Sequence, residues 1–273
     1  MSLRGRIAKE YVMVAMIVLA FIIILIPLIS MLYTILINGI GSISWEFLTS
    51  LPKPPGETGG GIGNAIQGSL MVVGVASAIS IPISVFAALH LSEYKGRFSS
   101  AVELITEVLS GTPSIVAGIF AYALIVSRTG FSAISGSIAL SVLMIPTVTI
   151  ASHESLRAVP DNIREAAIAL GVPKWRVSIS IVLRSATTGI GTGIILGVAR
   201  VFGETAPLLF TALGNLYWAR GIMEPAAGLP LLIYNYATSP YKTWQEQAWG
   251  AALVLLMIVL LLNIAIRIIA RKR

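Results

Sequence analysis

Long stretches without Asp, Glu, Lys or Arg are the feature that most limits how this chain can fold. Five of them cover residues 11–45, 58–92, 108–127, 129–152 and 247–266. A helix that crosses a bilayer needs about 20 apolar residues. A sixth stretch, 185–199, is shorter but continues past Arg200 and Glu204 into more apolar sequence. We therefore expect an all-α integral membrane protein with six transmembrane helices, near 11–37, 64–90, 104–127, 134–152, 185–210 and 248–267.

The composition supports the membrane class. Only 11% of the 273 residues are charged and the mean hydropathy is +0.89, whereas a soluble domain is about a quarter charged. The first apolar run is too long for a signal peptide and lacks a clear small-residue cleavage site, so it predicts a retained helix. The chain has no cysteine, which excludes disulfides, thiolate metal sites and a cysteine nucleophile.

The cationic residues predict the orientation. With six spans, fourteen Lys and Arg residues fall on the side that holds both termini and four fall on the other side. Because cytoplasmic loops are rich in Lys and Arg, both termini are expected in the cytoplasm of a cell (plasma) membrane protein. This bias accounts for most of the net charge of +7, so no nucleic-acid partner is needed to explain it.

Loop composition suggests a domain division. Residues 1–63 read as an N-terminal transmembrane helix and an external Pro/Gly linker, and the linker glycines lack the Lys-Ser/Thr that a phosphate loop requires. Residues 64–267 read as one membrane domain with a cytoplasmic loop at 153–184, and 268–273 as a basic tail. The aromatic-rich external loop 211–246 suits either an interfacial belt with a short surface helix or a docking surface for an external partner.

The polar segment 161–184 interrupts this mostly apolar chain. Pro160 and Asp161 predict a helix start, with Asp161 suited to capping. Gly171 and Pro173 predict a tight turn into a second short helix. The first helix is rich in small and apolar residues although it lies outside the bilayer. That face could pack on its own protein or insert into a groove of a partner.

The spacing in this segment resembles the EAA loop of ABC-importer permeases. Glu165, Ala166 and Ala167 are followed by Gly171, Ile181 and Leu183 at the family's intervals, although Arg184 stands where the family usually has Pro. The resemblance implies a type I ABC importer permease fold. It also implies a coupling loop, marked by Glu165, Ala166, Ala167 and Gly171, that docks on a separate ATPase subunit. The chain itself has no GxxxxGK[ST] motif.

Several charges lie in or near the expected spans. Arg200 and Glu204 are four residues apart, so they either form a self-satisfying ion pair or line a translocation path. Glu103 and Glu107 suit the cytoplasmic interface, and His153 has no second His nearby to complete a metal site. We expect no catalytic or metal-binding residues. Small residues around Gly189, Gly191, Gly193 and Gly197 suggest a permease dimer interface.

The stretches 199–212 and 109–120 are similar to phosphate-importer permeases, and to the PstA subunits more than to the PstC subunits. This resemblance implies a transport subunit that is not an enzyme and binds no cofactor, with ATP used by a partner. The implied partners are a PstC-like permease, two copies of a PstB-like ATPase and an external PstS-like phosphate-binding protein. Three other functions remain open: import of another oxyanion such as molybdate or sulfate, ion-coupled secondary transport, and a structural membrane subunit.

Overall fold

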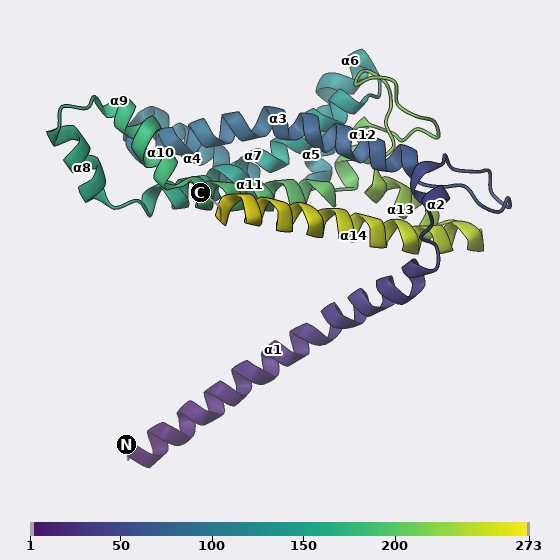
Figure 1. Cartoon of the computed structure of the whole chain (residues 1–273), viewed down its shortest axis with the longest axis horizontal. Helices are drawn as coiled ribbons and strands as arrows, with labels where there is room; N and C mark the ends of the chain where they lie inside the picture. Colours follow the sequence, from purple (N-terminus) through teal and green to yellow (C-terminus); the bar gives the residue numbers. More distant parts are fainter. Residues whose placement is uncertain (1–2, 272–273) are drawn as a thin grey trace.

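A computed structural model describes residues 3–271, and every regular element in that range is helical. Figure 1 shows most helices lying side by side in one elongated bundle. The elements are α1 Leu3–Ile40, α2 Trp45–Thr49, α3 Gly63–Glu93, α4 Arg97–Ser110, α5 Ser114–Ala121, the π-helical turn η1 Tyr122–Val126, α6 Ser127–Thr129, α7 Ala133–Arg157, α8 Asp161–Ala169, α9 Lys174–Val177, the π-helical turn η2 Ser178–Val182, α10 Leu183–Ser185, α11 Thr187–Phe202, α12 Ala206–Thr211, α13 Leu229–Ala237 and α14 Lys242–Arg271. The expectation of an all-α membrane protein is confirmed.

The helices are compatible with six spans. Within the described range, α1, α3, α7 and α14 are each long and apolar enough to cross a membrane alone. Two further spans are possible as bent pairs, residues 97–110 with 114–129 at 105° and residues 174–185 with 187–202 at 70°. Six spans are thus reached only if each bent pair crosses the membrane as one broken span, and the apolar runs alone did not reveal these two bends.

Glycine and proline explain where the expected helices break. The helix expected over 104–127 is interrupted after Ser110 at Gly111 and Pro113, because the residue before a proline avoids helical geometry. The helix expected over 185–210 ends at Phe202, and α12 begins at Ala206 with Pro207 in its first turn. A single continuous fifth helix was therefore a wrong expectation.

The centre of the bundle is the packed pair α3 and α7. Leu140, Met144 and Val148 of α7 are fully buried. Small hydroxyl side chains join the two helices. Ser84 Oγ donates to the Ile145 carbonyl oxygen at 3.1 Å, and Ser137 Oγ lies 3.0 Å from the Val72 carbonyl oxygen. Such contacts are typical of helix packing in membranes, where small residues and interhelical hydrogen bonds replace the hydrophobic effect.

The glycines of α11 pack inside this chain. A Cβ added to Gly193 would lie 2.7 Å from Ala151 Cβ of α7, and one added to Gly189 would collide with Ser155 of the same helix. A Cβ added to Gly197 would likewise meet Val148. These three glycines therefore bring α11 against α7, which corrects the expectation that they serve a dimer interface.

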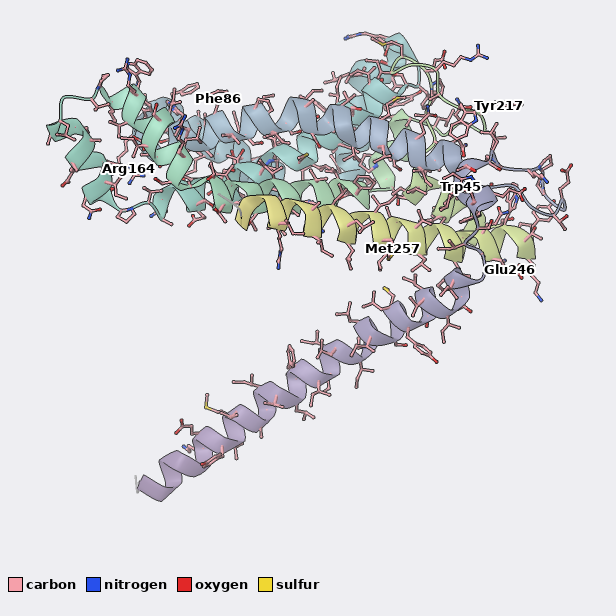
Figure 2. The ribbon with its side chains drawn as sticks, in the orientation of Figure 1. Trp45, Phe86, Arg164, Tyr217, Glu246 and Met257 are labelled. Atoms are coloured by element: carbon pink, nitrogen blue, oxygen red, sulfur yellow. The ribbon has the colours of Figure 1, made fainter. Side chains whose placement is uncertain are left out.

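Helix α1 stands apart from the bundle. It diverges from the other helices along its length, with side chains projecting on all sides (Figures 1 and 2). None of the residues in its most apolar stretch is buried. It contacts the bundle through α14, where a Cβ added to Gly39 would lie 2.7 Å from the Trp249 carbonyl oxygen. The apolar sides of α1 thus have no cover within the described part of this chain.

The aromatic loop 211–246 contains core as well as surface. Its helix α13 is buried at Leu229, Leu231 and Tyr236, so it is not the short surface helix that one of the two alternatives included. The Tyr236 ring stacks on Trp244 with centroids 4.6 Å apart, whereas Tyr217 is exposed. Figure 2 shows Tyr217 at the end of the molecule opposite Arg164.

Candidate functional site

The polar segment forms a helix, a turn and a second short helix at one end of the bundle (Figure 1). Helix α8 ends in a turn where Gly171 has φ +81°. The Val172 amide donates to the Ala167 carbonyl oxygen at 3.2 Å, which closes the helix end. Pro173 then precedes α9. The expected helix–turn–helix is confirmed, including the need for glycine at position 171.

The candidate coupling residues face two directions. Ala167 is buried against the cluster that contains Leu89, Leu156 and Val177, whereas Glu165, Ala166 and Gly171 are exposed. The segment also exposes large apolar side chains, namely Ile163, Ile168, Leu170 and Trp175, and Leu170 is 84% exposed. One side of this helix therefore packs on its own protein, and its other side is exposed.

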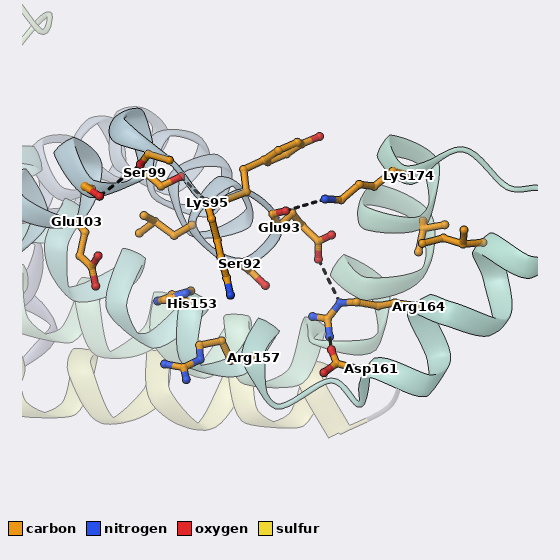
Figure 3. A pocket seen from close by; sticks show the side chains of 16 residues that line it. Ser92, Glu93, Lys95, Ser99, Glu103, His153, Arg157, Asp161, Arg164 and Lys174 are labelled. Carbon is orange, nitrogen blue, oxygen red and sulfur yellow. Dashed lines mark hydrogen bonds and ion pairs between the residues drawn. The ribbon is translucent and has the colours of Figure 1, made fainter.

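Arg164 attaches α8 to the bundle. Its Nη1 donates to the Val159 carbonyl oxygen at 2.7 Å and to Asp161 Oδ1 at 2.8 Å, and its Nη2 donates to the Leu156 carbonyl oxygen at 2.9 Å. Its Nε lies 3.2 Å from Glu93 Oε1 (Figure 3). Asp161 was expected to cap α8, but α8 has no side-chain cap and Asp161 instead accepts from Arg164.

Glu93 is the other centre of this cluster. Ser178 Oγ lies 3.1 Å from Glu93 Oε2, and Lys174 Nζ donates to the Glu93 carbonyl oxygen at 2.9 Å. No motif or spacing in the sequence marks Glu93 or Arg164 as functional residues. The one available signal was that Glu93 is the charge that ends the uncharged run 58–92.

A polar cavity of about 690 Å³ adjoins this cluster. Lys95, Glu103, His153 and Arg157 line it, and Figure 3 shows their side chains around the opening. Glu103 and Glu107 are exposed on α4, which agrees with solvated carboxylates near an interface. No group of three or more His, Asp or Glu side chains within the described residues could hold a metal ion.

Arg200 and Glu204 lie near the break after α11. Arg200 Nε is 3.9 Å from Glu204 Oε1, at the long limit of an ion pair, and the two side chains are 39% and 18% exposed. Arg200 Nη1 donates a shorter bond, 3.0 Å, to Thr147 Oγ1 of α7. The structure thus brings the expected pair together loosely, and the stronger contact of Arg200 is with a residue that sequence spacing could not reveal.

The break gives this cation an accessible position. Gly203 follows the last turn of α11, so Glu204 stands outside that helix and Arg200 stands at its C-terminal end. A cation is favoured at the negative end of the helix dipole. The arrangement can hold a guanidinium without full neutralisation, because Thr147 supplies a neutral acceptor and Glu204 is not within hydrogen-bond distance of Arg200 Nε.

The chain is similar to transport proteins of known families. Residues 80–273 match the family model described as binding-protein-dependent transport system inner membrane component. The phosphate transport system permease protein PstA of Yersinia pestis is 41% identical over 90% of this chain and 84% of its own length. That of Xylella fastidiosa is 44% identical over 86% and 83%. PstA 1 of Mycobacterium tuberculosis is 39% identical over 100% and 92%.

Solved structures agree on the fold. A bacterial alginate ABC transporter chain superposes with a TM-score of 0.71 at 14% identity, covering 99% of this chain and 97% of its own. A chain of the MetNI methionine ABC transporter gives 0.65 at 16% identity, covering 77% and 95%. At such identities these structures support the ABC importer permease fold and nothing about substrate.

The expected fold and family are therefore confirmed, while the domain limits 1–63, 64–267 and 268–273 stay predictions. The family match and the close relatives together establish that this chain belongs to the binding-protein-dependent transport permeases and, within them, to the PstA permease family, whose members are transport subunits and not enzymes.

Proposed function

We propose that this chain is a permease subunit that imports inorganic phosphate through the plasma membrane as part of an ATP-driven transporter. The observation that carries the proposal is its 39–44% identity to phosphate transport system permeases over 83–92% of their length. The partners are a second, PstC-like permease, two copies of a PstB-like ATPase and an external PstS-like phosphate-binding protein. The chain binds no cofactor, and ATP is used by the ATPase subunit.

Arg200 and Glu204 line the translocation path in this proposal. A guanidinium can bind phosphate through two parallel hydrogen bonds and keeps its charge at any physiological pH. A permanent tight pair with Glu204 would cancel that charge. The 3.9 Å separation and the neutral contact with Thr147 support an Arg200 that phosphate can engage. Binding must also be brief, since conduction needs sites that release their ion.

The loop 161–184 couples this path to ATP hydrolysis. Its exposed side, with Glu165, Ala166 and the turn at Gly171, enters a cleft of the ATPase, while Ala167 keeps α8 close to its own bundle. The exposed Leu170 and Trp175 supply apolar area for that contact. In the proposed orientation this end and both termini are cytoplasmic. The uncovered sides of α1 face lipid and the second permease.

Transport assays separate the alternatives. The complex is reconstituted in vesicles, and labelled phosphate uptake is measured with and without ATP, with molybdate and sulfate as competitors. We expect ATP-dependent uptake that neither competitor reduces. Uptake without ATP would favour a secondary transporter, and strong competition would favour another oxyanion. A structural subunit would tolerate neutral residues at 200 and 204.

Arg200→Gln tests the path directly. It is expected to reduce uptake to near background while membrane insertion and ATPase co-purification persist, because the docking loop lies at the other end of α11. Arg128→Gln removes an exposed cation from the end of α6 and is the matched control, with near-normal uptake expected. Wild-type uptake by Arg200→Gln would make Arg200 a structural charge only.

A further inference from the structure

The cluster around Glu93 joins the end of α3 to the segment α8–η2, which lies far from it in sequence. Arg164 comes from α8, Glu93 from the last turn of α3, and Lys174 and Ser178 from α9 and η2. Arg164 also reaches the carbonyl oxygen of Leu156 in the last turn of α7 and that of Val159 just after this helix. We call Glu93, Arg164, Lys174 and Ser178 the coupling latch.

We propose that the coupling latch makes helix α8 move as one body with the inner ends of α3 and α7, so that Glu93 and Arg164 are positioning residues that transmit ATPase motion to the transport path. This inference rests on the proposed function of the loop 161–184. It adds residues that the coupling motif does not include, since Glu93 lies 71 positions before Arg164.

Burial makes the latch a strong connection. The side chains of Glu93 and Arg164 are only 5% and 16% exposed. Water therefore screens their attraction less than it screens a surface pair. By contrast, the nearby pair Arg157 and Glu154 is separated by 4.0 Å with side chains 66% and 68% exposed. Such a solvated pair contributes little to holding two segments together.

The remaining donors hold both sides of the Glu93 turn. Ser178 Oγ can donate to the second carboxylate oxygen at 3.1 Å, although its single proton is shared with the Lys174 carbonyl oxygen at 3.0 Å. Lys174 Nζ donates to the Glu93 backbone and lies 4.9 Å from the centre of the Tyr94 ring. The helices before and after Gly171 are thus both fastened to the end of α3.

The helices attached to the latch lead to the transport path. α3 is continuous over 31 residues from one end of the bundle to the other. On α7, Leu156 at the latch and Thr147 at Arg200 are nine residues apart, which is roughly 14 Å along a helix. A shift of α8 that carries the end of α7 with it would therefore displace the Thr147 hydroxyl that holds Arg200.

Glu93→Gln is the informative variant. The amide has the same shape and removes the charge, and Arg164 keeps three other acceptors, at Leu156, Val159 and Asp161. Arg164→Ala is less suitable because it would leave the Glu93 carboxylate buried without its cation. Glu154→Gln makes the same change at the solvated pair and is the matched control.

The test measures phosphate import and ATP hydrolysis in the same vesicles containing the complete transporter. For Glu93→Gln we expect normal co-purification of the ATPase and continued hydrolysis. The phosphate imported per ATP is expected to fall by about fivefold or more, the lower range of measured coupling between sites. Ser178→Ala should shift this ratio in the same direction by less, and Glu154→Gln should leave it unchanged.

The possible results are distinct. A wild-type ratio in an assembled Glu93→Gln transporter would overturn the proposal, and so would loss of ATPase binding, because the latch would then serve docking and not transmission. An equal fall for Glu154→Gln would also overturn it by removing the special role of the buried pair. If the unmodified complex imports no phosphate with ATP, the proposed function fails instead.

Discussion

At the scale of single residues, Gly171 fixes the direction in which the chain leaves α8. Its φ of +81° lies in the left-handed region, and a Cβ there would meet nothing within 4 Å. Backbone strain is therefore the cost that a Cβ brings at this position, about 1 kcal/mol or more for a branched side chain. Gly171→Val is expected to weaken ATPase co-purification, whereas Gly171→Asn should have a milder effect because Asn tolerates this conformation better.

Co-purification at increasing detergent or salt measures this difference. Gly41→Val is a suitable control, since position 41 also has open space around it but no positive φ. The idea that the turn geometry matters for docking fails if Gly171→Val binds the ATPase and transports as well as the Gly41→Val control does.

Residue identities could be predicted from sequence only where the pattern is local. Gly171 and the pair Arg200 and Glu204 were recognisable because turn chemistry and helical spacing act over a few positions. Thr147 and Glu93 were not recognisable, because each meets its arginine across more than fifty positions of sequence. Periodicity contains no information about which helices become neighbours, so contacts between helices needed the structure.

At the scale of elements, apolar length predicted the helices but not their breaks. A run of apolar residues fits a straight helix and a bent pair equally well, and the 105° bend at residues 111–113 depends on Gly111 and Pro113 within an otherwise uniform run. The small residues of α11 were visible in the sequence. Their partner helix was not, which is why an interface between subunits was expected in place of contact with α7.

The packing of α11 on α7 predicts that two Gly→Ala substitutions change the stability of the chain in opposite directions. Gly193→Ala places a methyl 2.7 Å from Ala151 Cβ and should destabilise the chain by about 1–3 kcal/mol, as overpacking does. Gly74→Ala lies on α3 with nothing within 4 Å, so it should stabilise by about 0.5–1 kcal/mol through helix propensity. Unfolding of the purified chain in mixed micelles checks both.

The pair of variants controls for the substitution itself, since both replace a helical glycine with alanine. A shift in the same direction at both positions would show that propensity alone governs them. It would remove the argument that close contact with α7 holds the end of α11, and Arg200 with it, in place.

At the scale of the whole molecule, the chain is a bundle with one helix left outside. α14 and α3 cover α11 and α7, while α1 touches α14 near Gly39 and then diverges. A helix apolar on all sides is stable only in lipid or against other helices. The structure of the single chain thus agrees with a subunit that completes its packing in a membrane and in an assembly.

The orientation of that bundle is the last prediction, and the absence of cysteine makes it cleanly testable. Single cysteines are placed at Glu57 and Lys242, expected outside, and at Lys9 and Asn162, expected inside; all four positions are exposed. An impermeant thiol reagent on intact cells should label the first two and reach the others only after permeabilisation, because the fourteen-to-four cation bias keeps the basic loops cytoplasmic. Asn162 is preferred to Lys174, whose amine holds Glu93. If Lys9 and Asn162 were labelled in intact cells and the other two positions were not, the orientation of the bundle would be inverted and the direction of coupling reversed. If Lys9 and Asn162 lay on opposite sides, an odd number of spans would separate them, which would rule out the six-span arrangement.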